Sequence, residues 1–307
     1  MAIDKNYLCE VIRPNDFDIF WGDVVEKLKT SDLNPMCDKD EFRSDSEIEV
    51  FQAYYDSIDN LKVSAWYVKP METSGKLPAL ILMPGYQSDP PVPKDWAKKG
   101  YACISVNPRG KVRSRSQFDP GYPGLLTYGI LDRNTYSYRG FYADAWRAVD
   151  FLLSRPEVDS DRIGVAGSSQ GGGLTIATSA IRREIKAASA GAPYLCGFKD
   201  AIKLTDSYPY QEINDYIDYY EGSEGKVFET LSYFDGICFA DKIDCSIIMN
   251  IGLQDNVCPP ETGYALFNQI KSENKKLYEY DGHGHDAGRV HYSVVIDDFF
   301  EQNLKLI

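Results

Sequence analysis

The amino-acid sequence predicts an α/β fold in which helices flank a central, mostly parallel sheet. Short, continuous apolar runs alternate along the chain with longer segments whose apolar residues recur at helical spacing. Continuous apolar runs are typical of parallel strands, because such strands are buried on both faces. A glycine-rich turn at residues 167–171 separates one of these runs from an apolar helix.

The first 45 residues are predicted to form an N-terminal extension that is helical in part. A helix is expected from Pro14 to about Thr30, because its apolar residues recur every three or four positions. These residues are Phe17, Phe20, Trp21, Val24, Val25 and Leu28. We expect this apolar stripe to dock on the main domain.

The next part of the sequence contains two segments typical of hairpin strands and two apolar segments typical of buried strands. Residues 47–55 and 61–68 predict a hairpin with its turn at 57–60, and residues 78–83 and 101–106 predict buried parallel strands around a short helix at 95–99. Residues 107–119 form a charged loop before a helix with one apolar face. That face consists of Phe141, Ala145, Ala148, Val149 and Leu152.

The second half of the chain repeats this alternation. Strands are predicted at 162–166, 187–190, 246–251 and 276–280, and helices at 174–181, 261–270 and 290–303. Residues 197–240 are rich in tyrosine and acidic groups. They predict a helical insertion over the C-terminal edge of the sheet, where such folds bind ligands; the alternative is a solvated insert without that role. We therefore expect one α/β domain at 1–307, with an N-terminal helical extension at 1–45 and an insertion at 197–240.

The composition restricts the partners and the compartment. A formal net charge of −13 at pH 7 argues against nucleic acid and against anionic membrane surfaces. The seven cysteines lack C-x-x-C spacing, so neither a metal site nor a disulfide framework is expected, and a reducing compartment fits. We expect no cofactor. No run is long enough to span a bilayer and no signal peptide is visible, so the expected location is cytoplasmic.

The turn at residues 167–171 reads Gly-Ser-Ser-Gln-Gly and matches the G-x-S-x-G pattern. In the α/β-hydrolase fold this pattern forms a sharp turn between a strand and a helix, and it projects a serine above the sheet. The helix N-terminus then directs free amides at the reaction centre. Ser169 is therefore the candidate nucleophile. The alternative is a glycine-rich turn with incidental serines, because the pattern alone is common.

A serine hydroxyl needs a base and an orienting acid to act as a nucleophile. Of the three histidines, His283 and His285 directly follow the last predicted strand. Asp255 follows the strand at 246–251, so the chain order serine, aspartate, histidine is that of the α/β-hydrolase fold. Taken alone, Asp255 also fits the less favoured reading of a turn or helix-capping residue. Glycines at 282 and 284 prevent strand alternation from deciding between the two histidines.

The reaction also requires two donors for the negative oxygen that develops on the substrate. One donor is expected to be the backbone amide of Gln170, which follows the nucleophile. The other is the amide of Gly85 or Tyr86, in the loop after the strand at 78–83.

Several longer motifs occur in order along the chain. They lie at residues 14–21, 85–86, 109–110, 129–132, 138–139, 167–173, 230–235 and 252–260. With these motifs the chain resembles, over nearly its whole length, the acetyl xylan esterases and cephalosporin C deacetylases of carbohydrate esterase family seven. The family's R-G-Q-G motif reads Arg-Gly-Lys-Val at 109–112 here, and the acid of its G-H-E motif is Asp286.

The resemblance implies a catalytic triad of Ser169, Asp255 and His285, and an oxyanion hole formed by the Tyr86 and Gln170 amides. It implies deacetylation of small acetylated carbohydrates such as xylo-oligosaccharides, and of cephalosporin C, without a metal ion and in a homo-oligomer, often a hexamer. A deacetylase of this kind should have a small acyl pocket. Two alternatives stay open, which are another α/β hydrolase such as a peptidase or longer-chain carboxylesterase, and a non-catalytic binding module.

Overall fold

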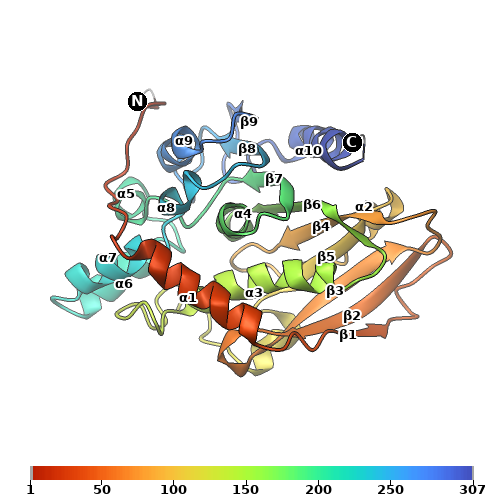
Figure 1. Cartoon of the computed structure of the whole chain (residues 1–307). Helices are drawn as coiled ribbons and strands as arrows, with labels where there is room; N and C mark the ends of the chain where they lie inside the picture. Colours follow the sequence, from red (N-terminus) through yellow and green to blue (C-terminus); the bar gives the residue numbers. More distant parts are fainter. Residues whose placement is uncertain (1–2, 306–307) are drawn as a thin grey trace.

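A computed structural model describes residues 3–305 and contains a nine-stranded sheet in the order β1-β2-β3-β5-β4-β6-β7-β8-β9 (Figure 1). The strands are β1 Met36–Lys39, β2 Ile48–Asp56, β3 Lys62–Pro70, β4 Leu77–Met83, β5 Ala102–Asn107, β6 Val158–Ser168, β7 Ile185–Gly191, β8 Ser246–Gly252 and β9 Lys275–Tyr280. Strands β1, β2, β3 and β5 pair antiparallel, and the neighbouring strands from β5 to β9 pair parallel. The predicted α/β fold with a mostly parallel sheet is confirmed.

Helices cover both faces of this sheet. They are α1 Phe17–Thr30, α2 Lys94–Lys98, α3 Ser137–Leu153, α4 Gln170–Ile181, α5 Phe198–Leu204, α6 Gln211–Tyr219, α7 Glu224–Ser232, α8 Ile237–Ala240, α9 Pro260–Gln269 and α10 Arg289–Leu304. Helices α2 and α10 lie on one face, and α3, α4 and α9 lie on the other (Figure 1). Two short 3-10 helices occur at η1 Ile58–Asn60 and η2 Val112–Ser116.

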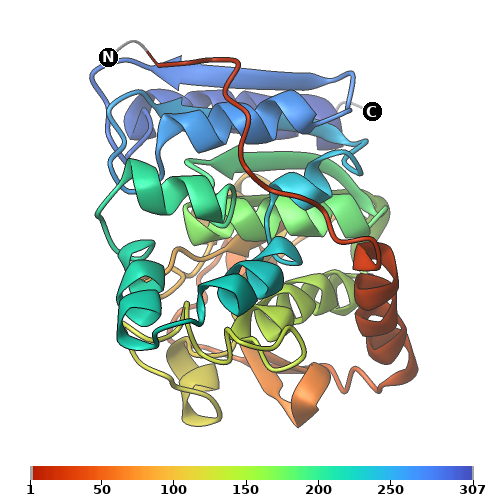
Figure 2. The same ribbon diagram turned by 90° about the vertical axis from the view of Figure 1, so that its left-hand side faces the viewer.

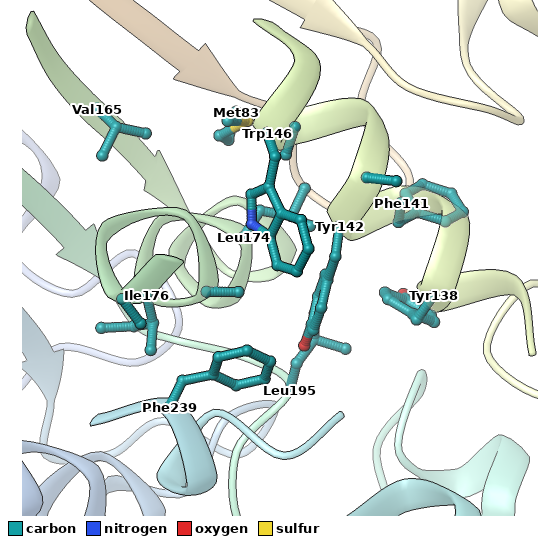
Figure 3. Close-up of a cluster of buried hydrophobic side chains, with 14 of the residues drawn as sticks. Met83, Tyr138, Phe141, Tyr142, Trp146, Val165, Leu174, Ile176, Leu195 and Phe239 are labelled. Carbon is teal, nitrogen blue, oxygen red and sulfur yellow. The ribbon is translucent and has the colours of Figure 1, made fainter. Parts of the chain in front are cut away.

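The larger of the two core layers lies between the sheet and α3 and α4. Tyr142 and Trp146 of α3 face Leu174 of α4 and Phe239 of α8 in this layer (Figure 3). The Tyr142 and Phe239 rings meet edge to face with their centroids 5.6 Å apart. Truncating an aromatic side chain buried this completely costs about 3–5 kcal/mol, so this layer fixes α4, and with it the turn before α4, against the sheet.

The stripe predicted on the first helix is buried as expected. Phe17, Trp21 and Val24 are almost fully covered, and the Trp21 indole N–H donates to the Tyr233 carbonyl at 2.8 Å. The sequence did not predict β1, which lies inside the segment expected to be helical in part. This strand has four residues, three of them exposed, so it carries no apolar alternation. It is recognisable only through its antiparallel pairing with β2.

Residues 3–16 cross the helical face as an extended N-terminal segment before α1 begins (Figure 2). Lys5 pairs with Glu279 of β9, and Tyr7 donates a hydrogen bond of 2.9 Å to Asp200 of α5. Arg13 then reaches Asp241, which follows α8. The segment therefore joins elements from three separate parts of the chain.

Residues 197–240 form α5 to α8, as the predicted helical insertion. Tyr208 and Pro209, between α5 and α6, reach the cavity above the C-terminal edge of the sheet, whereas Tyr219 is 79% exposed. The insertion thus contributes one wall of that cavity, and the rest of its tyrosines pack or face solvent. Among residues 3–305, no helix combines the length and the apolar character needed to cross a membrane.

Candidate active site

Ser169 lies in the sharp turn between β6 and α4, and its backbone is strained. Its φ of 59° and ψ of −122° are sparsely populated by residues with a side chain. The turn is held because the Ser169 N–H donates to the Gly191 carbonyl at 2.9 Å and the Tyr194 N–H donates to the Ser169 carbonyl at 3.0 Å. A Cβ on Gly167 would lie 2.5 Å from the Gly171 carbonyl oxygen, so close packing within the turn requires glycine.

Asp255 and His285 meet at the carboxyl ends of β8 and β9. The Asp255 side chain is 1% exposed and its Oδ2 atom lies 2.9 Å from Nδ1 of His285. Its other oxygen accepts the N–H groups of Val257 and Cys258 at 2.8 and 2.9 Å. Three hydrogen bonds therefore hold this buried carboxylate, and the imidazole that it orients lines the same cavity as Ser169.

The two histidines of the loop after β9 have different partners. His283 directs Nδ1 at Asp286 Oδ2, 2.7 Å away, and not at Asp255. The hydrogen bond from the His283 side chain lowers the pKa of the Asp286 carboxyl, and burial opposes this shift. The structure therefore brings His285, and not His283, to Asp255. Within residues 3–305 the Ser169 hydroxyl forms no hydrogen bond to His285, and catalytic contacts of this kind often tighten only when substrate binds.

The predicted oxyanion donors come from two elements, the start of α4 and the loop after β4. Gln170 is the first residue of α4, and Tyr86 lies in the loop after β4. Neither backbone N–H donates a hydrogen bond to another group of residues 3–305. The Gln170 side chain is also fixed, because it accepts a bond of 2.7 Å from the Tyr138 hydroxyl. Two amides are thus available beside the nucleophile, one of them at the positive end of a helix dipole.

A cavity of about 780 Å³ opens from Ser169 and His285. One end of it is walled by residues 84–86 of the loop after β4 and by Tyr208 and Pro209 of the insertion. The other end follows the α2 and α10 face of the sheet, past Trp96, Ser105 and Tyr292. The sequence did not predict this second end, because its walls come from strands and helices far apart in the chain. The cavity is larger than an acetyl group needs.

Cys258 lies beside the triad residues, and sequence reasoning gave it no role. One ligand atom each of Asp255, Cys258 and His285 lie within 4.8 Å of one another, a spacing that suits a metal ion. The Asp255 and His285 atoms are already hydrogen-bonded to each other, and burial raises the pKa of the Cys258 thiol. A cation would have to break the first interaction and deprotonate the thiol, so these three groups do not suit a metal ion.

Two departures from the family motif, Lys111 and Val112, lie in the segment after β5. Arg109 keeps its place and forms a buried ion pair with Asp144, N to O 3.0 Å. Lys111 donates a hydrogen bond through Nζ to the Tyr86 carbonyl. Val112 has a φ of 39°, where a β-branched residue is strained and glycine is not.

The strain at Val112 predicts that Val112→Gly stabilises the protein. Glycine adopts the left-handed conformation without strain, which stabilises the folded state. After the entropic cost of ordering a glycine is subtracted, the free energy of unfolding should rise by about 1 kcal/mol. Urea denaturation would measure it. Val290→Gly is the matched control, because Val290 lies exposed in the first turn of α10, and there glycine should lower stability. Equal losses from both variants would contradict the prediction.

Known proteins resemble this chain over nearly its whole length. The family model for acetyl xylan esterase (AXE1) matches residues 2–303. The solved structure of an acetyl xylan esterase from Paenibacillus sp. R4 superposes with a TM-score of 0.90 at 33% identity, and the match covers 98% of each chain. Acetyl xylan esterase 1 from Thermoanaerobacterium sp. gives a TM-score of 0.88 at 29% identity, over 97% of this chain and 96% of that one.

A curated relative is longer than this chain. The acetyl esterase Axe7A of Xylanibacter ruminicola is 27% identical over 293 residues, which make up 86% of this chain and 62% of that protein. The chain therefore spans less than two thirds of that relative. The family match covers nearly every residue and the structural likeness extends over the whole chain, so the protein has the α/β-hydrolase fold and belongs to the acetyl xylan esterase family, whose members are carboxylic ester hydrolases.

Proposed function

We propose that the protein is a serine esterase that removes acetyl groups from acetylated carbohydrates such as xylo-oligosaccharides. The observation that supports it most directly is the pairing of His285 with the buried Asp255 at the mouth of a cavity that Ser169 also lines. The family match supports the acetyl ester as the scissile group. Cephalosporin C, which the resemblance also implies, is a second proposed substrate.

In the proposed mechanism Ser169 Oγ attacks the acetyl carbonyl carbon and passes its proton to Nε2 of His285. Asp255 holds the Nδ1 side of the ring and stabilises the imidazolium that forms. The carbonyl oxygen becomes an oxyanion that the Tyr86 and Gln170 amides bind. When the tetrahedral intermediate collapses, the ester bond breaks and the sugar oxygen takes the proton from His285. Water, activated by the same histidine, then hydrolyses the acetyl-serine and releases acetate.

A panel of 4-nitrophenyl esters of increasing acyl length tests the proposed function. We expect kcat/KM for the acetate to exceed that for the octanoate by at least about tenfold, because a pocket suited to acetyl rejects added methylenes. The cavity volume alone does not impose this preference. Faster cleavage of the octanoate would assign the protein to the longer-chain carboxylesterases. Turnover of peptide amides would identify the protein as a peptidase. If no ester were hydrolysed, the remaining alternative would be a non-catalytic binding module.

Two further properties are proposed with this function. All seven cysteines are free thiols, which supports a reducing, cytoplasmic location. The family resemblance also favours a homo-oligomer, a hexamer, which sedimentation of the purified protein would test.

A further inference from the structure

Lys111 is a buried lysine behind the oxyanion loop, which we define as residues 84–86. The residue is only 3% exposed, and no carboxylate of residues 3–305 forms an ion pair with it. Burial lowers the pKa of the ammonium group to about 8; the negative charge of Asp89 opposes this shift and the positive charge of Arg115 adds to it. An ammonium group that is buried without a direct ion-pair partner is unfavourable for folding, so its position calls for a functional reason.

Within the described residues 3–305, the ammonium group makes its one hydrogen bond to the proposed oxyanion loop. Lys111 Nζ donates to the backbone carbonyl of Tyr86, the residue whose amide is the proposed donor. The Tyr86 hydroxyl is anchored separately, because it donates to Glu212 Oε1 at 2.7 Å and accepts the Leu126 N–H at 2.8 Å. Lys111 thus fixes the main chain of Tyr86 where the other two groups fix its side chain.

From the opposite side, the loop has weaker support. The Gln170 side-chain nitrogen lies 3.5 Å from both the Pro84 and the Gly85 carbonyl oxygens. Lys111 is therefore the charged side chain that bonds to the main chain of residues 84–86 in the described part of the protein. A small displacement of an oxyanion donor lowers the catalytic rate by a large factor. The hydrogen bond from Lys111 to the Tyr86 carbonyl therefore matters for catalysis.

We propose that Lys111 is a positioning residue that holds the Tyr86 amide toward the oxyanion and adds a positive charge behind it. This inference rests on the proposed esterase function. Glutamine, which the family motif has here, supplies the hydrogen bond without the charge, so lysine gives this chain a protonation-dependent oxyanion loop. A pocket of about 490 Å³ lined by Lys111, Arg115, Asp119 and Tyr86 gives the ammonium group a path for proton exchange.

The sign of the pH dependence follows from the charge. The cationic form stabilises the oxyanion and predominates below the pKa of Lys111, so kcat should fall as the pH rises through about 8. The groups that face the ammonium are Asp89 after the loop and Arg115 and Asp119 around η2. Glu212, reached through the Tyr86 hydroxyl, has its own pKa raised by burial.

The experiment compares pH profiles of 4-nitrophenyl acetate hydrolysis, corrected for spontaneous hydrolysis, for the wild type, Lys111→Gln and Lys111→Met. We expect Lys111→Gln to lower kcat about tenfold with little change in KM and to lose the alkaline fall, and Lys111→Met to lower kcat about a hundredfold. A wild-type rate that stays constant up to pH 10, or an alkaline fall that Lys111→Gln retains at the same midpoint, would overturn the proposal.

Two variants outside the site keep the test decisive even if the Lys111 variants do not fold. Arg115→Gln removes a neighbouring cation, so the alkaline midpoint should move up by roughly a few tenths of a pH unit at low salt, and Asp89→Asn should move it down. Unmoved midpoints in both variants would refute the assignment to Lys111. A wild type without esterase activity would instead refute the proposed function, so the two failures are distinguishable.

Discussion

Ser169→Ala is expected to lower kcat by about four to six orders of magnitude, the loss typical of serine triads without the nucleophile. The fold should persist, because alanine also carries a Cβ and experiences the same backbone strain at a φ of 59°. Steady-state kinetics with 4-nitrophenyl acetate, together with thermal unfolding, would measure both effects.

Ser168→Ala is the matched control for this variant. Ser168 ends β6 one position earlier and is exposed, and its side chain has no place in the proposed mechanism. The Ser168 variant should therefore keep most of the activity. Substantial turnover by a folded Ser169→Ala protein would disprove the acyl-enzyme mechanism, and equal losses in the two variants would place the defect in the turn and not in the nucleophile.

His285→Ala is expected to have the second largest effect. Without the imidazole, nothing accepts the Ser169 proton, and Asp255 loses the partner at 2.9 Å that it orients. We expect kcat to fall by about four orders of magnitude or more. His283→Ala removes the same side chain two residues away. It breaks the hydrogen bond to Asp286 and the ring contacts with Tyr280 and His291, none of which involves Ser169 or Asp255, so at least about a tenth of the activity should remain. If His283→Ala were as inactive as His285→Ala, the assignment of the base would be wrong.

The sequence predicted those features that depend on backbone geometry near a motif. The strained turn at Ser169 requires glycine at positions 167 and 171, and both glycines can be read directly from the G-x-S-x-G pattern in the sequence. The positions of Asp255 and His285 follow from the ends of strands, which continuous apolar runs mark clearly. The choice between His283 and His285 came from the family resemblance alone, because the glycines around them leave the loop conformation undetermined until it packs.

Other features depend on contacts that no local pattern reveals. Lys111 reads as a residue of a charged loop, and its burial against Tyr86 depends on how that loop returns to the sheet. The end of the cavity near Trp96 and Tyr292 depends on the distance between α2 and α10. Strand β1 exists because its backbone pairs with β2, although its side chains are mostly exposed.

The N-terminal segment has a consequence for the order in which the protein matures during synthesis. Lys5 and its partner Glu279 are 274 residues apart, and Tyr7 and Asp200 are 193 apart. At about 5–20 residues per second, Glu279 emerges from the ribosome on the order of half a minute after Lys5. Residues 3–16 are thus made well before the residues that anchor them, so their contacts with α5 and β9 form late. Substitutions there should mainly accelerate unfolding and leave the folding rate nearly unchanged.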